Sequence, residues 1–418
     1  MLRLPRSTRR PRPNGLRRTL LTTITALTVL QLTATTATAS AAVTATEAKR
    51  AASPAALSTL ADCAGHGCSS FSPAVTSQID SVIAEVMQAA DIPGVDVGLW
   101  IPGKGNYVRA FGVADTKTGA PMRTDMNFRV GSETKTFTAT VLLELAGLGR
   151  VRLDDPIDKY VPGVLDGDKI TVRDLADMRS GLYEYTNDVG FEESLLAKPM
   201  QSFTPQRLLG YSFKHGLDFQ PGTAWEYSDT NFVVLGLLIQ RVTGVDIADA
   251  LRYGATYPSR LFHSFLPYRP SQFPSPRAHG YTKNQGKQLD RTFWTPSWAW
   301  AAGGMISNLW DLRRWARDVA VGTLLKPAIQ KQRVDFLPTT IANLSYGLGL
   351  FDYSGWIGHD GIVPGYNSLA VYLPQQRATL VILANTDTLY QGTTPPVSLL
   401  ADLITKIVTP ENTYGVSP

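Results

Sequence analysis

Ser132 and Lys135 are the residues whose types and spacing best suit chemistry, in the stretch Ser-Glu-Thr-Lys. Three positions make about one helical turn, so a helix would place the hydroxyl and the amine side by side on one face. A serine hydroxyl is a poor nucleophile at neutral pH and needs a base within hydrogen-bond reach. Lys135 suits that task if it is held neutral or passes its charge on. A capped helix with an exposed lysine has the same spacing, so the pair alone does not decide.

The elements around this pair are expected to place Ser132 at the start of a helix. Gly131 breaks the extended segment before it, and residues 138–146 carry the apolar side chains of a buried helix. At a helix N-terminus the unpaired N–H groups and the positive end of the dipole favour an alkoxide or an oxyanion. This location therefore favours attack by the Ser132 hydroxyl on a carbonyl carbon.

Two further motifs follow downstream, Tyr-Ser-Asp at residues 227–229 and His-Asp-Gly at residues 359–361. With Ser-x-x-Lys ahead of them, the chain resembles the serine β-lactamase and penicillin-binding protein superfamily, and more closely its class C and D-alanyl-D-alanine carboxypeptidase branch. The signature of that branch is S-x-x-K, then Y-x-N, then K-T-G or H-x-G. Similar segments in the same order extend over roughly residues 75–405.

The resemblance implies how the first two motifs share the work. Ser132 would be the nucleophile, and Lys135 and Tyr227 would titrate as a coupled pair, so neither is named the sole base. The Tyr227 phenol would carry a proton between the nucleophile and the leaving group. Without the other motifs, an ordinary half-buried tyrosine would be the expected reading of this position.

The third motif would supply the rest of the site. His359 is the histidine expected to touch it, the alternative being a turn histidine bonded to backbone. By resemblance, the backbone N–H groups of Ile362 and Ser132 form the oxyanion hole, which is typically worth a few kcal/mol per donor. Gly361 would let the backbone approach the substrate closely.

Two positions depart from the family pattern and bear on substrate choice. Asp229 stands where relatives usually carry Asn, and a carboxylate cannot donate to a substrate carbonyl as an amide does. Asp360 stands where they carry Thr, and a carboxylate repels a terminal carboxylate. Alternatively, Asp360 turns outward and pairs with an arginine of the helix around 312–317, and Asn231 supplies the missing amide. The sequence leaves both views open.

Hydrophobic patterning and the resemblance agree on an α+β fold of the β-lactamase/transpeptidase type, an antiparallel sheet flanked by helices. Alternating apolar residues predict hairpins at 95–113 and 368–384 that share one sheet. Helical periodicity predicts helices at 79–90 and 397–408. A mainly helical lobe is inserted into this sheet body, and the resemblance implies that the active site lies in the groove between sheet and lobe.

The beginning of the chain has the composition of an export signal. Residues 1–41 hold seven arginines and no acidic residue. Their charge of +7 exceeds the net charge of +5 of the whole chain, so the remainder is slightly acidic. Nucleic-acid binding is therefore not expected. Sec and twin-arginine export both fit. The expected parts are a secretory signal peptide (1–41), an Ala/Ser/Thr-rich tether (42–73) and a hydrolase domain (74–418), with its sheet body at about 74–132 and 301–418 and its helical lobe at about 133–300.

Cys63 and Cys68 are the only cysteines of the chain, and in an exported protein a small disulfide loop is the expected outcome. A metal site with His66 is the alternative, but three ligands make no closed tetrahedral set. We therefore expect neither a metal nor a cofactor. No segment after the leader reaches the length that a bilayer span needs, so no transmembrane anchor is expected in the mature chain.

Taken together, the residues predict a secreted or wall-associated serine hydrolase with an acyl-enzyme mechanism, cleaving amide bonds at D-residues as a D-alanyl-D-alanine carboxypeptidase does. Two other functions remain open: an esterase, D-aminopeptidase or β-lactamase-like hydrolase, and a catalytically slow penicillin-binding or sensing protein. The expected partners are a small peptide, ester or β-lactam substrate and, more widely, peptidoglycan. We expect a monomer.

Overall fold

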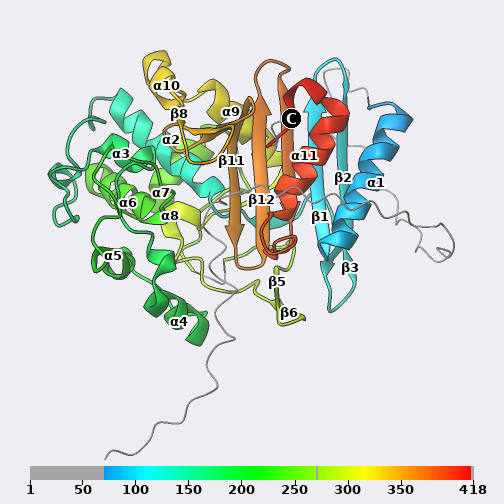
Figure 1. The fold of residues 1–418 in the computed structure, drawn as a ribbon, viewed down its shortest axis with the longest axis horizontal. Coiled ribbons are helices and arrows are strands. Elements are labelled where there is room, and N and C mark those ends of the chain that lie inside the picture. The colour runs from blue at the N-terminus through cyan, green and yellow to red at the C-terminus, as the bar shows by residue number, and fades with distance from the viewer. Residues whose placement is uncertain (1–69, 270–271, 416–418) are drawn as a thin grey trace, which may run out of the picture.

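The computed structural model describes residues 70–269 and 272–415. Its body is a nine-stranded, fully antiparallel sheet with strand order β3-β2-β1-β13-β12-β11-β10-β9-β8 (Figure 1). The strands of this sheet are β1 (Gly94–Ile101), β2 (Gly105–Asp115), β3 (Ala120–Pro121), β8 (Leu337–Pro338), β9 (Leu344–Tyr346), β10 (Phe351–Tyr353), β11 (Trp356–Val363), β12 (Tyr366–Leu373) and β13 (Ala378–Ala384).

The two predicted hairpins meet at the centre of the sheet. β1 lies between β2 and β13, and Val97 pairs with Ile382 across the junction. All eight residues of β1 and all seven of β13 are buried, as expected for strands that helices cover on both faces. The prediction that N-terminal and C-terminal strands share one antiparallel sheet is confirmed.

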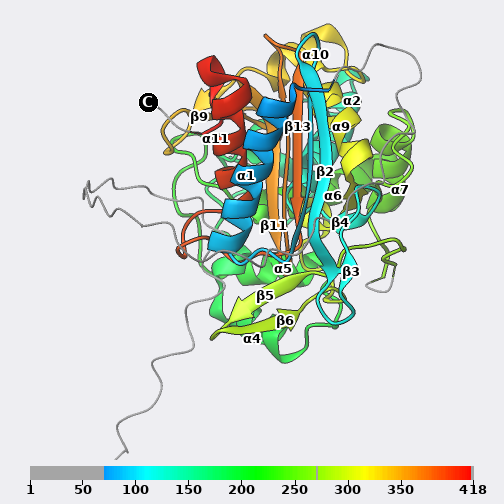
Figure 2. The same ribbon diagram turned by 90° about the vertical axis from the view of Figure 1, so that its right-hand side faces the viewer.

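Helices cover both faces of the sheet (Figure 2). On one face lie α1 (Pro73–Ala89) and α11 (Pro396–Val408), which pack against each other. On the other lie α2 (Glu133–Gly147) and α9 (Leu309–Val321). α1 begins six residues before the predicted start because Ser72 caps it and Pro73 occupies its first turn, two signals that apolar periodicity does not register.

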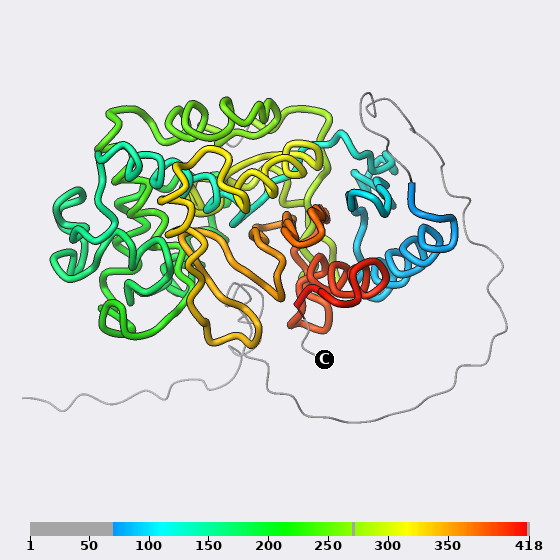
Figure 3. Tube along the Cα trace, turned by 90° about the horizontal axis from the view of Figure 1, so that it is seen from above, coloured from blue at the N-terminus to red at the C-terminus, as the bar shows by residue number. Residues whose placement is uncertain are grey.

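A mainly helical lobe lies beside the sheet, on the side away from α1 and α11 (Figure 3). The helices of this lobe, together with those that connect it to the sheet body, are α3 (Val172–Ala176), α4 (Val189–Ala197), α5 (Pro205–Phe213), α6 (Asp229–Thr243), α7 (Ile247–Leu251), α8 (Trp300–Gly303) and α10 (Pro327–Arg333). The short 3-10 helices are η2 (Ile157–Lys159), η3 (Tyr185–Asn187) and η5 (Pro410–Asn412), and η4 (Arg252–Thr256) is a π-helix.

Two small two-stranded ladders join the lobe to the sheet. One pairs β4 (Asn127–Arg129) with β7 (Ile306–Asn308), and the other pairs β5 (Tyr281–Asn284) with β6 (Lys287–Asp290). β5 and β6 fall within residues 133–300, the stretch expected to form the helical lobe. The Tyr281 N–H of β5, however, donates to the carbonyl of Asn385, just after β13, at 3.1 Å. The C-terminal part of the expected lobe is therefore tied to the sheet body.

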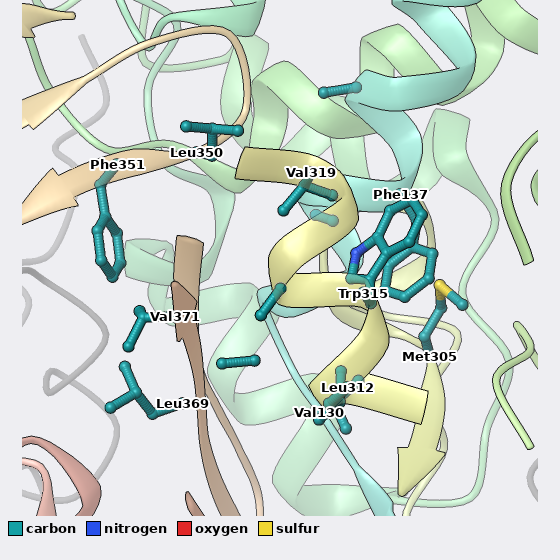
Figure 4. Close-up of a cluster of buried hydrophobic side chains, with 14 of the residues drawn as sticks. Val130, Phe137, Met305, Leu312, Trp315, Val319, Leu350, Phe351, Leu369 and Val371 are labelled. Atoms are coloured by element: carbon teal, nitrogen blue, oxygen red, sulfur yellow. The ribbon is translucent and has the colours of Figure 1, made fainter. Parts of the chain in front are cut away.

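α2 is held in place by a buried cluster between α2, α9 and the sheet (Figure 4). Trp315 of α9 stacks on Phe137 of α2, with ring centroids 4.1 Å apart. The indole N–H of Trp315 donates to the Thr136 hydroxyl at 2.7 Å. Aromatic pairs of this kind contribute about 0.5–1.5 kcal/mol beyond the apolar area that they bury. The cluster thus fixes the helix at whose start Ser132 lies.

None of the single helices in the described ranges is long and apolar enough to cross a membrane. One pair, Asp229–Thr243 with Ile247–Thr256, meets the same length and composition test only when both are joined across an 84° bend.

Candidate active site

Ser132 is the N-cap residue of α2, as the sequence predicts, but its side chain makes no capping hydrogen bond. Its hydroxyl is instead the acceptor of a hydrogen bond from Lys135 Nζ at 2.9 Å. The side chain is nearly buried, with 7% of the residue exposed. The one-turn spacing therefore brings the hydroxyl and the amine into contact at a helix N-terminus.

Lys135 is fully buried and makes three polar contacts through Nζ. Besides Ser132, it donates to Asp229 Oδ1 at 2.5 Å and to the Ala302 carbonyl of α8 at 2.9 Å. Nζ also lies 4.7 Å from the centroid of the Tyr227 ring, on the face of that ring. Three different segments thus converge on one amine.

Asp229 is the first residue of α6, and its carboxylate forms an ion pair with Lys135. The residue type at this position is expected to affect a substrate carbonyl, but the side chain turns to the lysine, and only 3% of the residue is exposed. An acidic residue in the first turn of a helix is also stabilised by the helix dipole. The carboxylate is therefore part of the buried charge cluster around Ser132.

Glu184 also belongs to this cluster, although no motif of the sequence points to it. Its carboxylate accepts the backbone N–H of Asp229 and, at 2.9 Å, that of Thr186. Burial, followed by the charge of Asp229, raises the pKa of Glu184 to about 7. Its only signal in the sequence was its place in the segment 180–188, which resembles a family segment.

Tyr227 lies just before α6, in the loop position that the sequence predicts. Its hydroxyl makes no hydrogen bond of ordinary geometry to a protein group. Burial, then Asp229 and Tyr346, raise the pKa of Tyr227 well above its usual value, and the neighbouring Ser132 hydroxyl lowers it by less. The resting side chain is therefore a neutral phenol beside Ser132.

The two segments expected to form the oxyanion hole are in direct contact. Gly131 has a positive φ of 51°, and a Cβ there would lie 2.8 Å from the Ile362 nitrogen. A Cβ on Gly361 would lie 2.8 Å from the Ser132 nitrogen. Glycine is needed at both positions because the two backbones approach this closely. The roles of the Ser132 and Ile362 N–H groups as oxyanion donors remain a prediction.

His359 lies inside β11, the strand that precedes β12, and is 1% exposed. Its Nε2 is 3.0 Å from the Tyr346 hydroxyl. Its Nδ1 is 2.6 Å from the Asp360 carbonyl oxygen and 3.0 Å from the Asp360 nitrogen. His359 meets the rest of the site through its ring, 6.1 Å from that of Tyr227. Tyr346 had not been anticipated.

The side chain of Asp360 leaves β11 on the sheet face opposite to that of Gly361, because successive residues of a strand point to opposite faces. This side chain is 35% exposed, and its Oδ1 lies 3.5 Å from His359 Nδ1. The carboxylate therefore lies beside the preceding residue, whereas the alternative left open by the sequence was a pairing with an arginine of the 312–317 helix. After burial, the charge of Asp360 is the next cause that raises the pKa of Tyr353 and of Tyr414.

Asn231 does not supply the missing amide in this structure. Its Oδ1 accepts the Ser180 hydroxyl at 2.5 Å, its Nδ2 contacts the Met178 sulfur at 3.4 Å, and 1% of the residue is exposed. The reason is helical geometry: Asn231 is two positions beyond Asp229, so it points to another side of α6.

Cys63 and Cys68 lie outside the described residues, so their expected disulfide stays a prediction. Within the ranges that are described, no group of three or more His, Cys, Asp or Glu side chains is arranged to hold a metal ion.

Comparison with known proteins gives one family for most of the chain. The family model described as Beta-lactamase matches residues 79–400, a stretch that includes all three motifs. Among curated relatives, Protein flp of Staphylococcus aureus (strain COL) is 24% identical over 326 residues, which is 75% of this chain and 64% of that protein. The chain thus spans about two thirds of the length of the curated relatives that it matches.

Solved structures with the same fold include two amide hydrolases. The D-stereospecific amidohydrolase from Streptomyces sp. has a TM-score of 0.69 and 31% identity, over 79% of this chain and 98% of that one. D-amino acid amidase from Ochrobactrum anthropi SV3, complexed with L-phenylalanine amide, has a TM-score of 0.71 and 28% identity, over 81% and 100% of the two chains.

Proposed function

The chain belongs to the β-lactamase family, and on that premise we propose that it is a serine hydrolase that forms an acyl-enzyme on Ser132 and cleaves amide bonds at D-configured residues. The observation that carries the proposal is the 2.9 Å contact between the fully buried Lys135 Nζ and Ser132 Oγ. A structural lysine has no reason to be buried against a nucleophile at a helix N-terminus.

The first half of the proposed reaction is acyl transfer to Ser132. Ser132 Oγ forms a bond to the carbonyl carbon, its proton passes to the Lys135 and Tyr227 system, and the N–H groups of Ser132 and Ile362 hold the oxyanion. The carbon–nitrogen bond then breaks, and the leaving amine takes the proton. In the second half, water hydrolyses the ester and frees Ser132.

The substrate end favoured by the site is an uncharged amide or ester. Both ring nitrogens of His359 are engaged, and Asp360 is anionic and begins on the far face of the sheet, so neither offers a donor to a terminal carboxylate. The Streptomyces and Ochrobactrum enzymes, named for D-stereospecific amide hydrolysis, support the same class. D-alanyl-D-alanine carboxypeptidase activity, the first expectation from the motifs, is the competing outcome.

The protein is proposed to act outside the cell membrane, and the arginine-rich leader supports this location. Its proposed substrates there are small peptides of the cell-wall type. A monomeric state is part of the same proposal.

The test compares the purified wild-type protein with Ser132→Ala on three substrates: an acylated lysyl-D-alanyl-D-alanine, its C-terminal amide, and a D-amino acid amide. We expect faster hydrolysis of the amides, no turnover by the variant, and an acyl adduct on Ser132 detected by mass spectrometry. Preference for the free acid would establish a carboxypeptidase instead. A stable adduct without turnover would indicate a penicillin-binding or sensing protein, and an active Ser132→Ala variant would refute the mechanism.

A further inference from the structure

The three N–H donors of a Lys135 ammonium have three acceptors in the structure: Ser132 Oγ, Asp229 Oδ1 and the Ala302 carbonyl. An ammonium nitrogen has three donors and no lone pair, so it cannot accept the Ser132 proton. The lysine must therefore lose one proton before it can act as a base.

Among these three acceptors, the Asp229 carboxylate is the one that can hold a proton at ordinary pH. A serine hydroxyl and a peptide carbonyl are far weaker bases. The carboxylate is also placed for a direct transfer, with Oδ1 2.5 Å from Nζ. Both partners are buried, so a proton that passes between them does not have to cross solvent.

We propose that Asp229 takes a proton from Lys135 and thereby lets the lysine serve as the base for Ser132. The inference rests on the serine hydrolase function proposed above. The Nζ–H bond breaks as an O–H bond forms on Asp229, which leaves a neutral amine and a carboxylic acid. The amine then takes the Ser132 proton as Oγ attacks. When the leaving amine is protonated by Lys135, Asp229 returns its proton to the lysine, and the charges are restored. The asparagine of the family motif cannot perform this step.

Glu184 positions Asp229 for this exchange by accepting its backbone N–H. When ionised, the Glu184 carboxylate also repels the negative charge of Asp229. The titratable groups that face Asp229 are Lys135 on α2, Glu184 and Tyr185 near η3, Tyr227 before α6, and Tyr346 on β9.

The first test is the pH profile of kcat/KM for Asp229→Asn on the preferred amide. In the wild type the lysine proton moves to Asp229 and stays within the pair. Deprotonation of Lys135 therefore does not make kcat/KM increase with pH. In the variant the proton must leave to solvent, so kcat/KM should fall about 100-fold at pH 7 and rise about tenfold per pH unit above it, with little change in KM. Asp311→Asn, which alters a buried aspartate in α9, is the matched control and should keep the wild-type profile.

The outcomes separate this proposal from the proposed function. If the wild type forms no adduct on Ser132, the serine hydrolase function fails. If the adduct forms but Asp229→Asn is unimpaired, or weaker by one constant factor at every pH, Asp229 is merely structural and the relay is refuted. Glu184→Gln gives a second measurement that leaves Asp229 in place. Wild-type kcat/KM should rise through about pH 7, where Glu184 ionises, and this rise should be absent in the variant. The same rise in both proteins would overturn the role of Glu184.

Discussion

Asp229 and Asp360 both replace uncharged residues of the family motifs, yet they lie in opposite surroundings. Asp229 is buried at the start of α6 and ion-paired with Lys135. Asp360 has a side chain that is one third exposed, and it begins on the sheet face away from Gly361. The same change of residue type therefore has different consequences: the first places a charge in direct contact with Lys135, and the second places one on the far face of the sheet, where it acts on Tyr227 only over a longer distance. Burial and partner decide the role.

The largest effect is expected from Lys135→Met. Activity should be lost, and the free energy of unfolding should fall by about 3–5 kcal/mol, because the substitution leaves the Asp229 carboxylate buried without its cation. Urea unfolding and amide hydrolysis measure both. The control is Lys135→Met combined with Asp229→Asn, which should recover most of the stability and none of the activity. Equal stability of the single variant and the wild type would mean that Asp229 does not depend on this pair.

The contrast between local and distant contacts explains how far the sequence could lead. Ser132 and Lys135 are three positions apart, so helical geometry alone predicts their contact. Lys135 and Asp229 are 94 positions apart and meet only because α2 and α6 pack together. Nothing in the local pattern distinguishes an aspartate that points to a lysine from one that points to a substrate.

Strand geometry had a similar limit. Alternating apolar residues predicted two hairpins correctly, but residues 359–361 contain a glycine and two polar residues, a composition that hides β11. Tyr346 comes from the short strand β9, next to the edge strand β8, and its contact with His359 depends on the arrangement of strands β9, β10 and β11. The sequence therefore placed His359 in the motif without its partner.

Asp177 is a third case beside Asp229 and Asp360. It is a buried carboxyl group with no ion-pair contact, and its Oδ1 lacks a hydrogen-bond partner. Burial, then Asp174, raises its pKa from 3.8 to about 7. The folded state therefore favours the protonated form, and stability is lost as pH rises from about 4 to about 7. Asp177→Asn should remove this loss and raise the free energy of unfolding at pH 8 by up to a few kcal/mol.

Urea unfolding of Asp177→Asn and wild type at pH 4 and pH 8 measures this difference. The two proteins should be about equally stable at pH 4, where Asp177 is protonated in the folded state. A gain of the same size at both pH values would show that titration of Asp177 is not the cause.

A smaller effect is expected from Tyr346→Phe. The substitution keeps the ring but removes the hydroxyl that lies 3.0 Å from His359 Nε2, leaving a buried nitrogen without its hydrogen-bond partner. The free energy of unfolding should fall by about 1–3 kcal/mol, as measured by urea unfolding. Tyr353→Phe, on the neighbouring strand β10, is the matched control and should have less effect. A larger loss in the control would mean that His359 does not rely on Tyr346.

The smallest effect should come from Asp360→Asn, which is the same chemical change as Asp229→Asn made in the other motif. Because Asp360 begins on the far face of the sheet, removing its charge should change kcat/KM by less than about threefold and stability by no more than about 0.5 kcal/mol. The decisive measurement is the ratio of rates on the free-acid peptide and its amide. An unchanged ratio would keep Asp360 away from the substrate terminus. A shift of tenfold or more toward the free acid would mean that its carboxylate reaches that terminus and selects against negative charge, so that both motif aspartates act on the reaction.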